Sequence, residues 1–428
     1  MPSRRPASIL KVYSLGLISL GEFMDLDPEL ADISGPTILD STAPQGLEFH
    51  FAKDAKPLST PWQIAVERAR LIRKIGLKDG LILDPACGSG IQLAAYASTV
   101  GRRGLGIELD RDTAISANNN LKRVFQHSYS ESVKQSRIRI GDGTKGDSEI
   151  KVALLHLDPA RPRNSRTHNL SEMKPSLENV LVAWKKNMQT DNRGPAILLD
   201  LSPRLTDMQR LEVEEIVHSV WPGVGKTWTW TSRGGGRVDR LSLWIGQLAS
   251  SDVETRFIRI PPNSKIKPII IEGNRETCSP SKRLPKKGDY VTILDSALVQ
   301  SGLASSFMTT RIVGRELSWS EVDGRRPQVH HQNSLNLIDK NEALLVQASG
   351  KIVALIHCEL NAESIPIIVE KAREFGFGKI TLRLSVKPDL QPLLQGSIDR
   401  QLNSKGGESI GFIAKQPNDS MLMLCQER

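Results

Sequence analysis

Short apolar runs alternate with amphipathic stretches through the first half of the chain. An apolar run that ends at turn residues is typical of a strand buried within a parallel sheet. Such runs occur at 81–84, 104–109, 136–141, 152–158 and 196–201. Apolar residues at helical spacing predict helices over 57–76, 91–100, 112–125 and 175–188. Strands that alternate with helices predict an α/β fold built on a doubly wound parallel sheet.

Local signals place two elements more closely. Thr60 is expected to be the N-cap of the first helix, with Pro61 at its first position and Gly76 as its stop. Farther along, TWTWTSRGGGRVDRLSLWIG alternates Trp with Thr and turns at three glycines. This stretch predicts an antiparallel hairpin that closes the sheet, with Trp228 and Trp230 in the core.

Composition divides the chain into four parts. Residues 1–56 are expected to be a partly flexible N-terminal segment, with Met24 as an alternative start of translation. Residues 57–250 hold the α/β domain, which begins with a helical segment. Polar, Pro-containing stretches predict a small intermediate domain over 251–334. Strands and helices return afterwards, which predicts a small α+β domain over 335–428.

The charge of the chain favours a polyanionic partner. Lys and Arg number 57 against 48 Asp and Glu, so the net charge is +9. Aromatic residues make up only 5%, so a nucleic-acid surface would rely on Arg and Lys rather than on stacking. The four cysteines lie far apart without metal-binding spacing, which indicates a reducing compartment and no metal site. No apolar run reaches the roughly 18–20 residues that span a bilayer, so we expect a cytoplasmic protein without membrane contact.

The clearest chemical signal lies where the predicted strands end. Asp84, Glu108, Asp142 and Asp158 follow four of the apolar runs. Because the carboxyl ends of parallel strands meet at one edge of a sheet, these acids should line one ligand site.

The turn DPACGSG (84–90) indicates which ligand this edge takes. Gly88 and Gly90 let the backbone turn tightly and approach a ligand. A dinucleotide fingerprint would need Gly or Ala at position 93, where the chain has Leu93. The carboxylate of Asp84 suits a cationic amino-acid group better than a pyrophosphate. S-adenosylmethionine (SAM) carries an ammonium, a sulfonium and a ribose diol but no phosphate, and so fits this turn.

DPACGSG resembles motif I of the class I SAM-dependent methyltransferases, and GIELD (106–110) resembles their motif II. The resemblance implies a Rossmann-like methyltransferase sheet with SAM as cofactor. The cofactor-binding residues it implies are Asp84, Ala86, Gly88, Gly90, Glu108, Leu109, Asp142 and Gly143. In that arrangement Glu108 would accept hydrogen bonds from the ribose hydroxyls, and Asp142 would contact the adenine amino group.

A second motif, Asp158-Pro159-Ala160-Arg161, follows the fourth strand. Methyltransferases that act on amines often have a second Pro and an aromatic residue here, so Ala160 and Arg161 argue against methylation of a stacked base. No cysteine lies near the motif, which argues against carbon-5 pyrimidine methylation. We expect Asp158, Pro159 and Arg161 to be catalytic residues. The arginines at 161, 163 and 166 are expected to bind phosphate.

The order of HLDPARPRN, ILLDLSPRL and the Trp-Thr-Ser hairpin is similar to bacterial and archaeal class I methyltransferases with a C-terminal THUMP-like domain. The segment GKITLRLSVKPDLQPLLQ resembles that domain itself. True THUMP domains bind RNA, so the resemblance implies a structured RNA acceptor, either tRNA or rRNA. Two alternatives stay open: a protein or small-molecule acceptor, and a catalytically silent SAM-binding scaffold that binds RNA.

Three further groups have simpler interpretations. His156 is expected to be a buried, hydrogen-bonded histidine rather than a catalytic one. The pair His330 and His331 is expected in a loop without metal. Ser202, at a strand end, is equally compatible with a turn and with a substrate contact.

Overall fold

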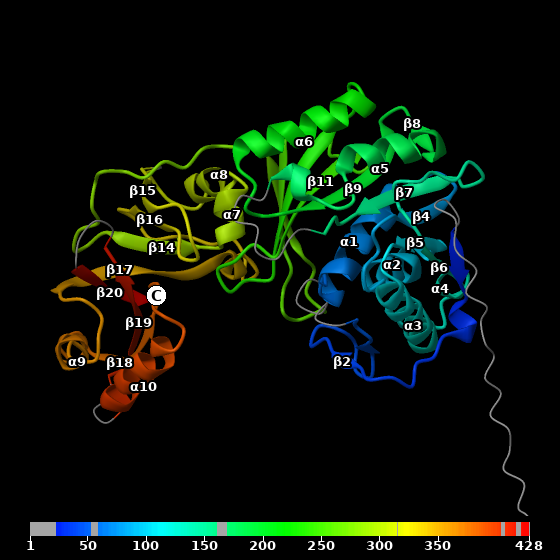
Figure 1. Cartoon of the computed structure of the whole chain (residues 1–428). Helices are drawn as coiled ribbons and strands as arrows, with labels where there is room; N and C mark the ends of the chain where they lie inside the picture. Colours follow the sequence, from blue (N-terminus) through cyan, green and yellow to red (C-terminus); the bar gives the residue numbers. More distant parts are fainter. Residues whose placement is uncertain are drawn as a thin grey trace, which may run out of the picture.

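The computed structural model describes residues 23–52, 59–160, 169–314, 316–403, 407–416 and 421–427. These residues form two units that lie side by side, each built around one large β-sheet (Figure 1). A two-stranded sheet of β2 (Ile38–Leu39) and β3 (Glu48–Phe49) precedes the first helix.

The sheet of the first unit has the strand order β1-β6-β5-β4-β7-β9-β11-β10-β12-β13, with β8 (Thr190–Asp191) paired to β9. Its parallel strands are β4 (Leu81–Asp84), β5 (Gly104–Glu108), β6 (Arg137–Ile140), β7 (Val152–Leu157) and β9 (Gly194–Leu201). The predicted hairpin is β10 (Lys226–Ser232) and β11 (Arg240–Gly246), and β11 runs antiparallel to β9. The remaining strands are β1 (Met24–Leu26), β12 (Thr255–Arg259) and β13 (Ile269–Gly273). The predicted doubly wound α/β class is confirmed.

Helices cover both faces of this sheet (Figure 1). One face carries α1 (Trp62–Ile75), α2 (Ile91–Tyr96) with the π-helical turn Ala97–Gly101, α3 (Arg111–Ser128) and α4 (Glu131–Lys134). The other carries α5 (Leu177–Trp184) and α6 (Asp207–Val220), with 3-10 turns at Leu170–Glu172 and Lys185–Asn187. Neighbouring strand residues therefore enter different cores, as Ile82 and Leu83 do. Burial on both faces explains why these strands are continuous apolar runs.

The start of α1 differs from the expectation. Pro61 is the N-cap residue, and Thr60 makes no capping bond, because its hydroxyl accepts hydrogen bonds from Arg240 (3.0 and 3.1 Å). The first helical N–H, that of Trp62, donates instead to Asp40 Oδ2 at 2.8 Å. The N-terminal segment thus supplies the cap, and together with the edge strand β1 it belongs to the first unit from residue 23 onward.

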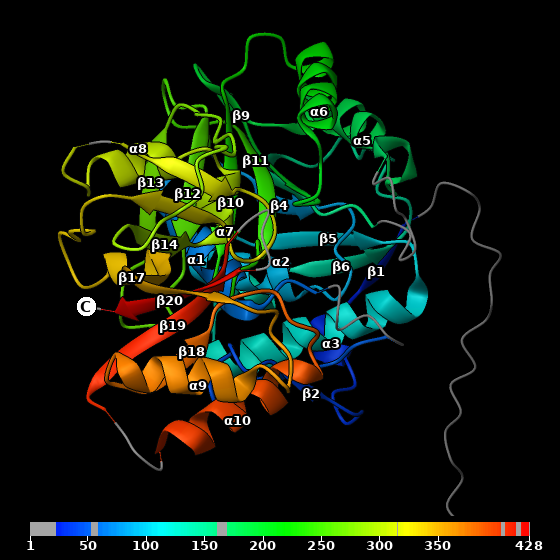
Figure 2. The same cartoon turned by 90° about the vertical axis from the view of Figure 1, so that its left-hand side faces the viewer.

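The second unit has a seven-stranded sheet with the order β15-β16-β14-β17-β20-β19-β18. These strands are β14 (Tyr290–Leu294), β15 (Ser318–Glu321), β16 (Gln328–His331), β17 (Val346–His357), β18 (Phe377–Leu382), β19 (Ser409–Lys415) and β20 (Met421–Glu427). Only β18 and β19 pair in parallel, across the connecting helix α10 (Leu390–Asn403). Helix α9 (Ile365–Glu374) lies beside α10 against the same end of the sheet (Figure 2).

Residues 251–334, expected to be an intermediate domain, are divided between the two sheets. β12 and β13 extend the first sheet, whereas β14, β15 and β16 belong to the second. His330 and His331, expected in a loop, lie in β16, because the polar residues around them are paired across the sheet.

The helices α7 (Ser296–Gln300) and α8 (Ala304–Thr309) join the two units through one hydrophobic core. Leu298 and Phe307 belong to the same buried cluster as Leu201, Trp230 and Leu243. A 3-10 turn at Glu342–Leu345 adds Leu345 to this cluster. Among the described residues, no helix has the length and apolar character needed to cross a lipid bilayer.

Candidate functional site

The predicted acids do lie along one edge of the first sheet. Asp84 and Glu108 are the last residues of the adjacent parallel strands β4 and β5, and Asp142 and Asp158 follow β6 and β7. Asp84 and Glu108 are linked through the glycine turn, because Gly88 N donates to Glu108 Oε2 at 3.0 Å. The four carboxylates therefore lie along the edge of the sheet where the parallel strands end, which we call the acidic edge.

The two glycines of the turn have different roles. Both have positive φ, +51° at Gly88 and +68° at Gly90, where a side chain would be strained. A Cβ at Gly90 would lie 2.8 Å from Ala117 Cβ, so this residue lets the turn pack against α3. A Cβ at Gly88 would meet no described atom within 4 Å. Gly88 therefore exposes its backbone to open space at the acidic edge.

Glu108 has spare acceptor capacity beside Gly88. Its two oxygens accept from Gly88 N and Asp110 N, both at 3.0 Å. A carboxylate offers about four acceptor sites, so two remain for hydroxyl donors. Burial raises the pKa of Glu108 above its ordinary value, although the backbone hydrogen bonds oppose this shift. The residue is thus suited to a neutral diol, which replaces water around a partly desolvated carboxylate.

The neighbouring candidates extend the surface away from Glu108. Leu109 is 75% exposed and presents an apolar side chain at the edge. Asp142 is exposed, and its Oδ1 accepts from Thr144 N and Oγ1 at 2.9 and 2.7 Å. These two residues and Glu108 supply an apolar contact and two carboxylates on one side of the turn.

Gly143 and Ala86 support the turn through the backbone. A Cβ at Gly143 would lie 1.9 Å from Pro85 O, so only glycine allows these two loops to touch. The Gly143 carbonyl accepts from Trp184 Nε1 at 2.8 Å. Ala86 N donates to Asp84 Oδ1 at 3.3 Å. The loop after β6 is thereby held against the loop after β4.

The second motif is described only in part. Asp158 is half-buried and Pro159 is buried. Ala160 forms a backbone pair with Lys174, with N···O distances of 2.8 and 2.9 Å, which fixes the chain just beyond Asp158. Arg161, predicted to be catalytic, lies outside the described residues, as do the arginines at 163 and 166.

A buried polar network lies directly beneath the acidic edge. His156 Nδ1 is 2.8 Å from Asp84 Oδ2, and its Nε2 is 3.3 Å from Asp200 Oδ2. Arg68 Nη1 donates to the same Asp200 oxygen at 2.6 Å. Gln92 Nε2 lies within hydrogen-bonding distance of Asp200, Tyr96 and His156. The network links Asp84 to the centre of the sheet.

Charge compensation sets the protonation of this network. Burial alone would lower the pKa of His156, but the Asp84 carboxylate and the bonds to Asp200 and Asp84 raise that pKa well above its ordinary value. Burial would raise the pKa of Asp200, but Arg68 and His156 hold it far below its ordinary value. An imidazolium and a guanidinium thus balance two carboxylates. The expectation of a buried, hydrogen-bonded His156 agrees with this geometry.

Arg68, Gln92 and Asp200 were not predicted to matter. Asp200 interrupts the apolar run AILLDL, and a charged residue inside a buried strand indicates a buried partner. Arg68 lies in α1 and is 1% exposed, which the helical pattern alone does not reveal. Their pairing depends on how α1 crosses the sheet.

Other candidate nucleophiles and ligands are structural. Cys87 is buried, and a Cβ at Gly106 would lie 2.7 Å from its sulfur, so the thiol points into the core. Trp228 and Trp230 are buried, as expected. Ser202 is buried and its Oγ accepts from Arg204 N at 3.2 Å, which is a turn contact. Within the described ranges, no group of three or more His, Cys, Asp or Glu side chains is placed to hold a metal ion.

Comparison with known proteins identifies the fold. No family model matches the chain, and no protein of curated function matches it. A solved structure from Porphyromonas gingivalis W83, described as a methyltransferase, has a TM-score of 0.53 and 15% identity and covers 88% of this chain and 83% of that one. A SAM-dependent methyltransferase from Agrobacterium tumefaciens has a TM-score of 0.33 and 16% identity, over 47% of this chain and 67% of that one. The glycopeptide N-methyltransferase MtfA, solved with SAM, has a TM-score of 0.30 and 14% identity, over 42% and 93%. The Porphyromonas structure shares the fold across most of the chain.

Proposed function

We propose that this chain is a SAM-dependent methyltransferase that acts on structured RNA, either tRNA or rRNA. The observation that carries the first part is Gly88, whose backbone faces open space beside the Glu108 carboxylate. That combination suits a ligand with a ribose diol and no phosphate. The shared fold with a protein described as a methyltransferase supports the same assignment.

The described residues fit SAM at this edge. Gly88 would contact the methionine part, Glu108 the ribose hydroxyls, and Leu109 with Asp142 the adenine. Bound SAM supplies an electrophilic methyl group on a sulfonium centre. The rate of such a displacement depends largely on alignment, so the chain needs mainly to position the acceptor atom.

Asp158 is the residue placed for that task. It follows β7, the strand next to β4, so it lies one strand away from the glycine turn. Its carboxylate would accept a hydrogen bond from the acceptor group and orient the lone pair of that group. Ala160, paired with Lys174, holds this part of the loop in place.

An RNA acceptor is supported by charge. The net charge is +9, and three arginines follow Asp158 in the sequence. Phosphates of a polyanion release counterions when arginines neutralise them, so a basic protein gains affinity for RNA.

The test is transfer of labelled methyl from SAM to total RNA from cells that lack the gene, with and without RNase. The proposal expects label in RNA that RNase removes. Label in protein or in small molecules would replace RNA by the corresponding acceptor class. SAM binding without transfer to any of these fractions would indicate a silent scaffold.

Deletion of the residues after 335 would not test the role of the second unit alone, because it would also disturb the first unit. β14 pairs with β17, and Leu345 belongs to the core shared by both units. Such a truncation would expose this core, so point variants in the second unit are the better test.

A further inference from the structure

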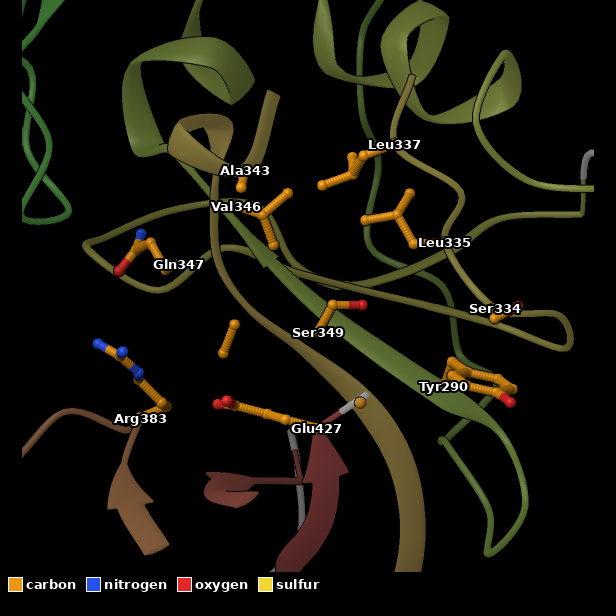
Figure 3. A pocket seen from close by; sticks show the side chains of 12 residues that line it. Tyr290, Ser334, Leu335, Leu337, Ala343, Val346, Gln347, Ser349, Arg383 and Glu427 are labelled. Carbon is orange, nitrogen blue, oxygen red and sulfur yellow. The ribbon is translucent and has the colours of Figure 1, made fainter. Parts of the chain in front are cut away.

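The second unit contains a cavity that is separate from the acidic edge. Its volume is about 320 Å³, within the range of small-ligand sites. Leu335, Leu337 and Val346 gather at one side, and Arg383 with Glu427 lies at the other (Figure 3). Ser349 and Tyr290 also line the cavity. One end is therefore apolar and the other is charged.

Arg383 is the cationic residue of the charged end. Arg383 follows β18, and its Nε is buried with no hydrogen-bond partner among the described residues. Arg326 donates to Gln347 Oε1, and Gln347 also lines the cavity. Burial, together with the positive charges of Arg383 and Arg325, lowers the pKa of Arg326. Arg383 thus lies close enough to Arg326 for their charges to interact, at the end of the cavity that also carries Glu427.

This group of arginines adjoins the first unit at its ligand edge. β10 runs parallel to β12 and in the same direction as β9, so the turn after β10 lies at the edge where Asp84 and Asp158 lie. A Cβ at Gly236 in that turn would lie 2.4 Å from Arg325 O. The segment that carries Arg325 and Arg326 therefore lies beside this turn.

We propose that this cavity binds one nucleotide, with its phosphate at Arg383 and its base against Leu335, Leu337 and Val346. Guanidinium groups bind phosphate oxygens through paired, charge-assisted hydrogen bonds. That the nucleotide is part of an RNA acceptor rests on the proposed function.

Calorimetric titration of the full chain with the four nucleoside 5′-monophosphates tests the site. S-adenosylhomocysteine is kept saturating, so that nucleosides do not enter the edge of the first sheet. We expect at least one monophosphate to bind, and its nucleoside to bind about tenfold more weakly. Arg383→Gln should weaken binding of the monophosphate by about tenfold or more. Lys379→Gln, which removes an exposed charge on β18, should leave binding unchanged.

A substitution with the opposite expected effect on binding separates an anion site from a structural role of Arg383. Glu427→Gln removes the carboxylate that faces the arginines and should tighten binding of the monophosphate. The site is overturned if no monophosphate binds, if Arg383→Gln binds like Lys379→Gln, or if Glu427→Gln weakens binding.

A 5′-phosphorylated single-stranded RNA octamer distinguishes the two sources of the nucleotide. Competition by the octamer supports RNA, whereas binding of mononucleotides alone overturns the RNA assignment and supports a free nucleotide. Loss of monophosphate binding in Arg383→Gln, together with no methyl transfer to RNA, would uphold the cavity and reject the proposed function.

Discussion

The two units bury charge in opposite ways. Beneath the acidic edge of the first sheet, Arg68, Asp84, His156 and Asp200 are at most 2% exposed, and each is paired. In the second unit the core under α9 and α10 is apolar, and the charged residues Arg383 and Glu427 line a cavity instead. A paired buried network holds groups in fixed positions, whereas at the cavity the buried Nε of Arg383 has no hydrogen-bond partner among the described residues. On the proposed function, this difference would place the chemistry in the first unit and the docking of the acceptor in the second.

The largest effect should follow from Asp158→Ala. Loss of the group that orients the acceptor should lower kcat by about a hundredfold or more. The Kd of SAM should change by no more than about threefold, because Asp158 is not among the residues that fit the cofactor. Methyl transfer and SAM titration measure the two effects.

The matched control for Asp158→Ala is Asp112→Ala, which removes an exposed carboxylate at the start of α3. It should leave both kcat and the Kd of SAM unchanged. Full activity of Asp158→Ala would remove this residue from the mechanism and with it the division of labour between the units.

Arg68→Met should destabilise the fold strongly. It leaves Asp200 buried with one cationic partner fewer, and breaking a buried pair costs about 3–5 kcal/mol. In the second unit, Ile380→Ala, in the apolar core, should cost about 2–5 kcal/mol. Urea unfolding at several pH values separates the two: the cost of Arg68→Met should depend on pH, and that of Ile380→Ala should not. Equal pH dependence would contradict the contrast between the two cores.

The protonation of His156 should make the stability of the first unit depend on pH. Its pKa is raised in the folded state, so its contribution is complete below the unfolded pKa of about 6.5 and is lost as pH rises through the folded value. The difference in free energy of unfolding between the wild type and His156→Gln should therefore shrink as pH rises above about 6.5. A difference that stays constant or grows over this range would show that the imidazolium contributes nothing.

The smallest effect concerns a helix end. Thr206 and Gln209 form a capping box at the start of α6, whereas α9 in the second unit begins without a side-chain cap. Thr206→Ala should lower the free energy of unfolding by about 1 kcal/mol. Thr206→Ser, which keeps the hydroxyl, should restore most of it, and denaturant titration measures both.

Sequence patterns predicted the first unit better than the second, for a physical reason. Leu81 to Leu83 form a strand buried on both faces, so the apolar run itself marks the element. β17 instead alternates buried residues with partly or fully exposed ones along most of its 12 positions. Within the polar stretch 318–331, β16 pairs with β14, and β15 pairs with β16. The local periodicity of the sequence does not reveal pairing between strands that are far apart in the chain.

The same limit applies to the site. Asp84, Gly88 and Glu108 lie at strand ends, where a parallel topology predicts a ligand edge. The pairing of Arg68 with Asp200 joins residues 132 positions apart and depends on the packing of α1. The arginines at 326 and 383 meet only through the fold of the second sheet, so no local motif indicated them.

The core shared through α7 and α8 has a consequence for the choice of acceptor. A hinge motion between the units would expose Leu298 and Phe307 to water, and this cost opposes such a motion. The distance between the cavity at Arg383 and the strand end at Asp158 is then fixed by the packing between the units. If the proposed acceptor binds at both places, it would have to span that spacing with its own three-dimensional shape, and the protein would select by length as well as by local chemistry.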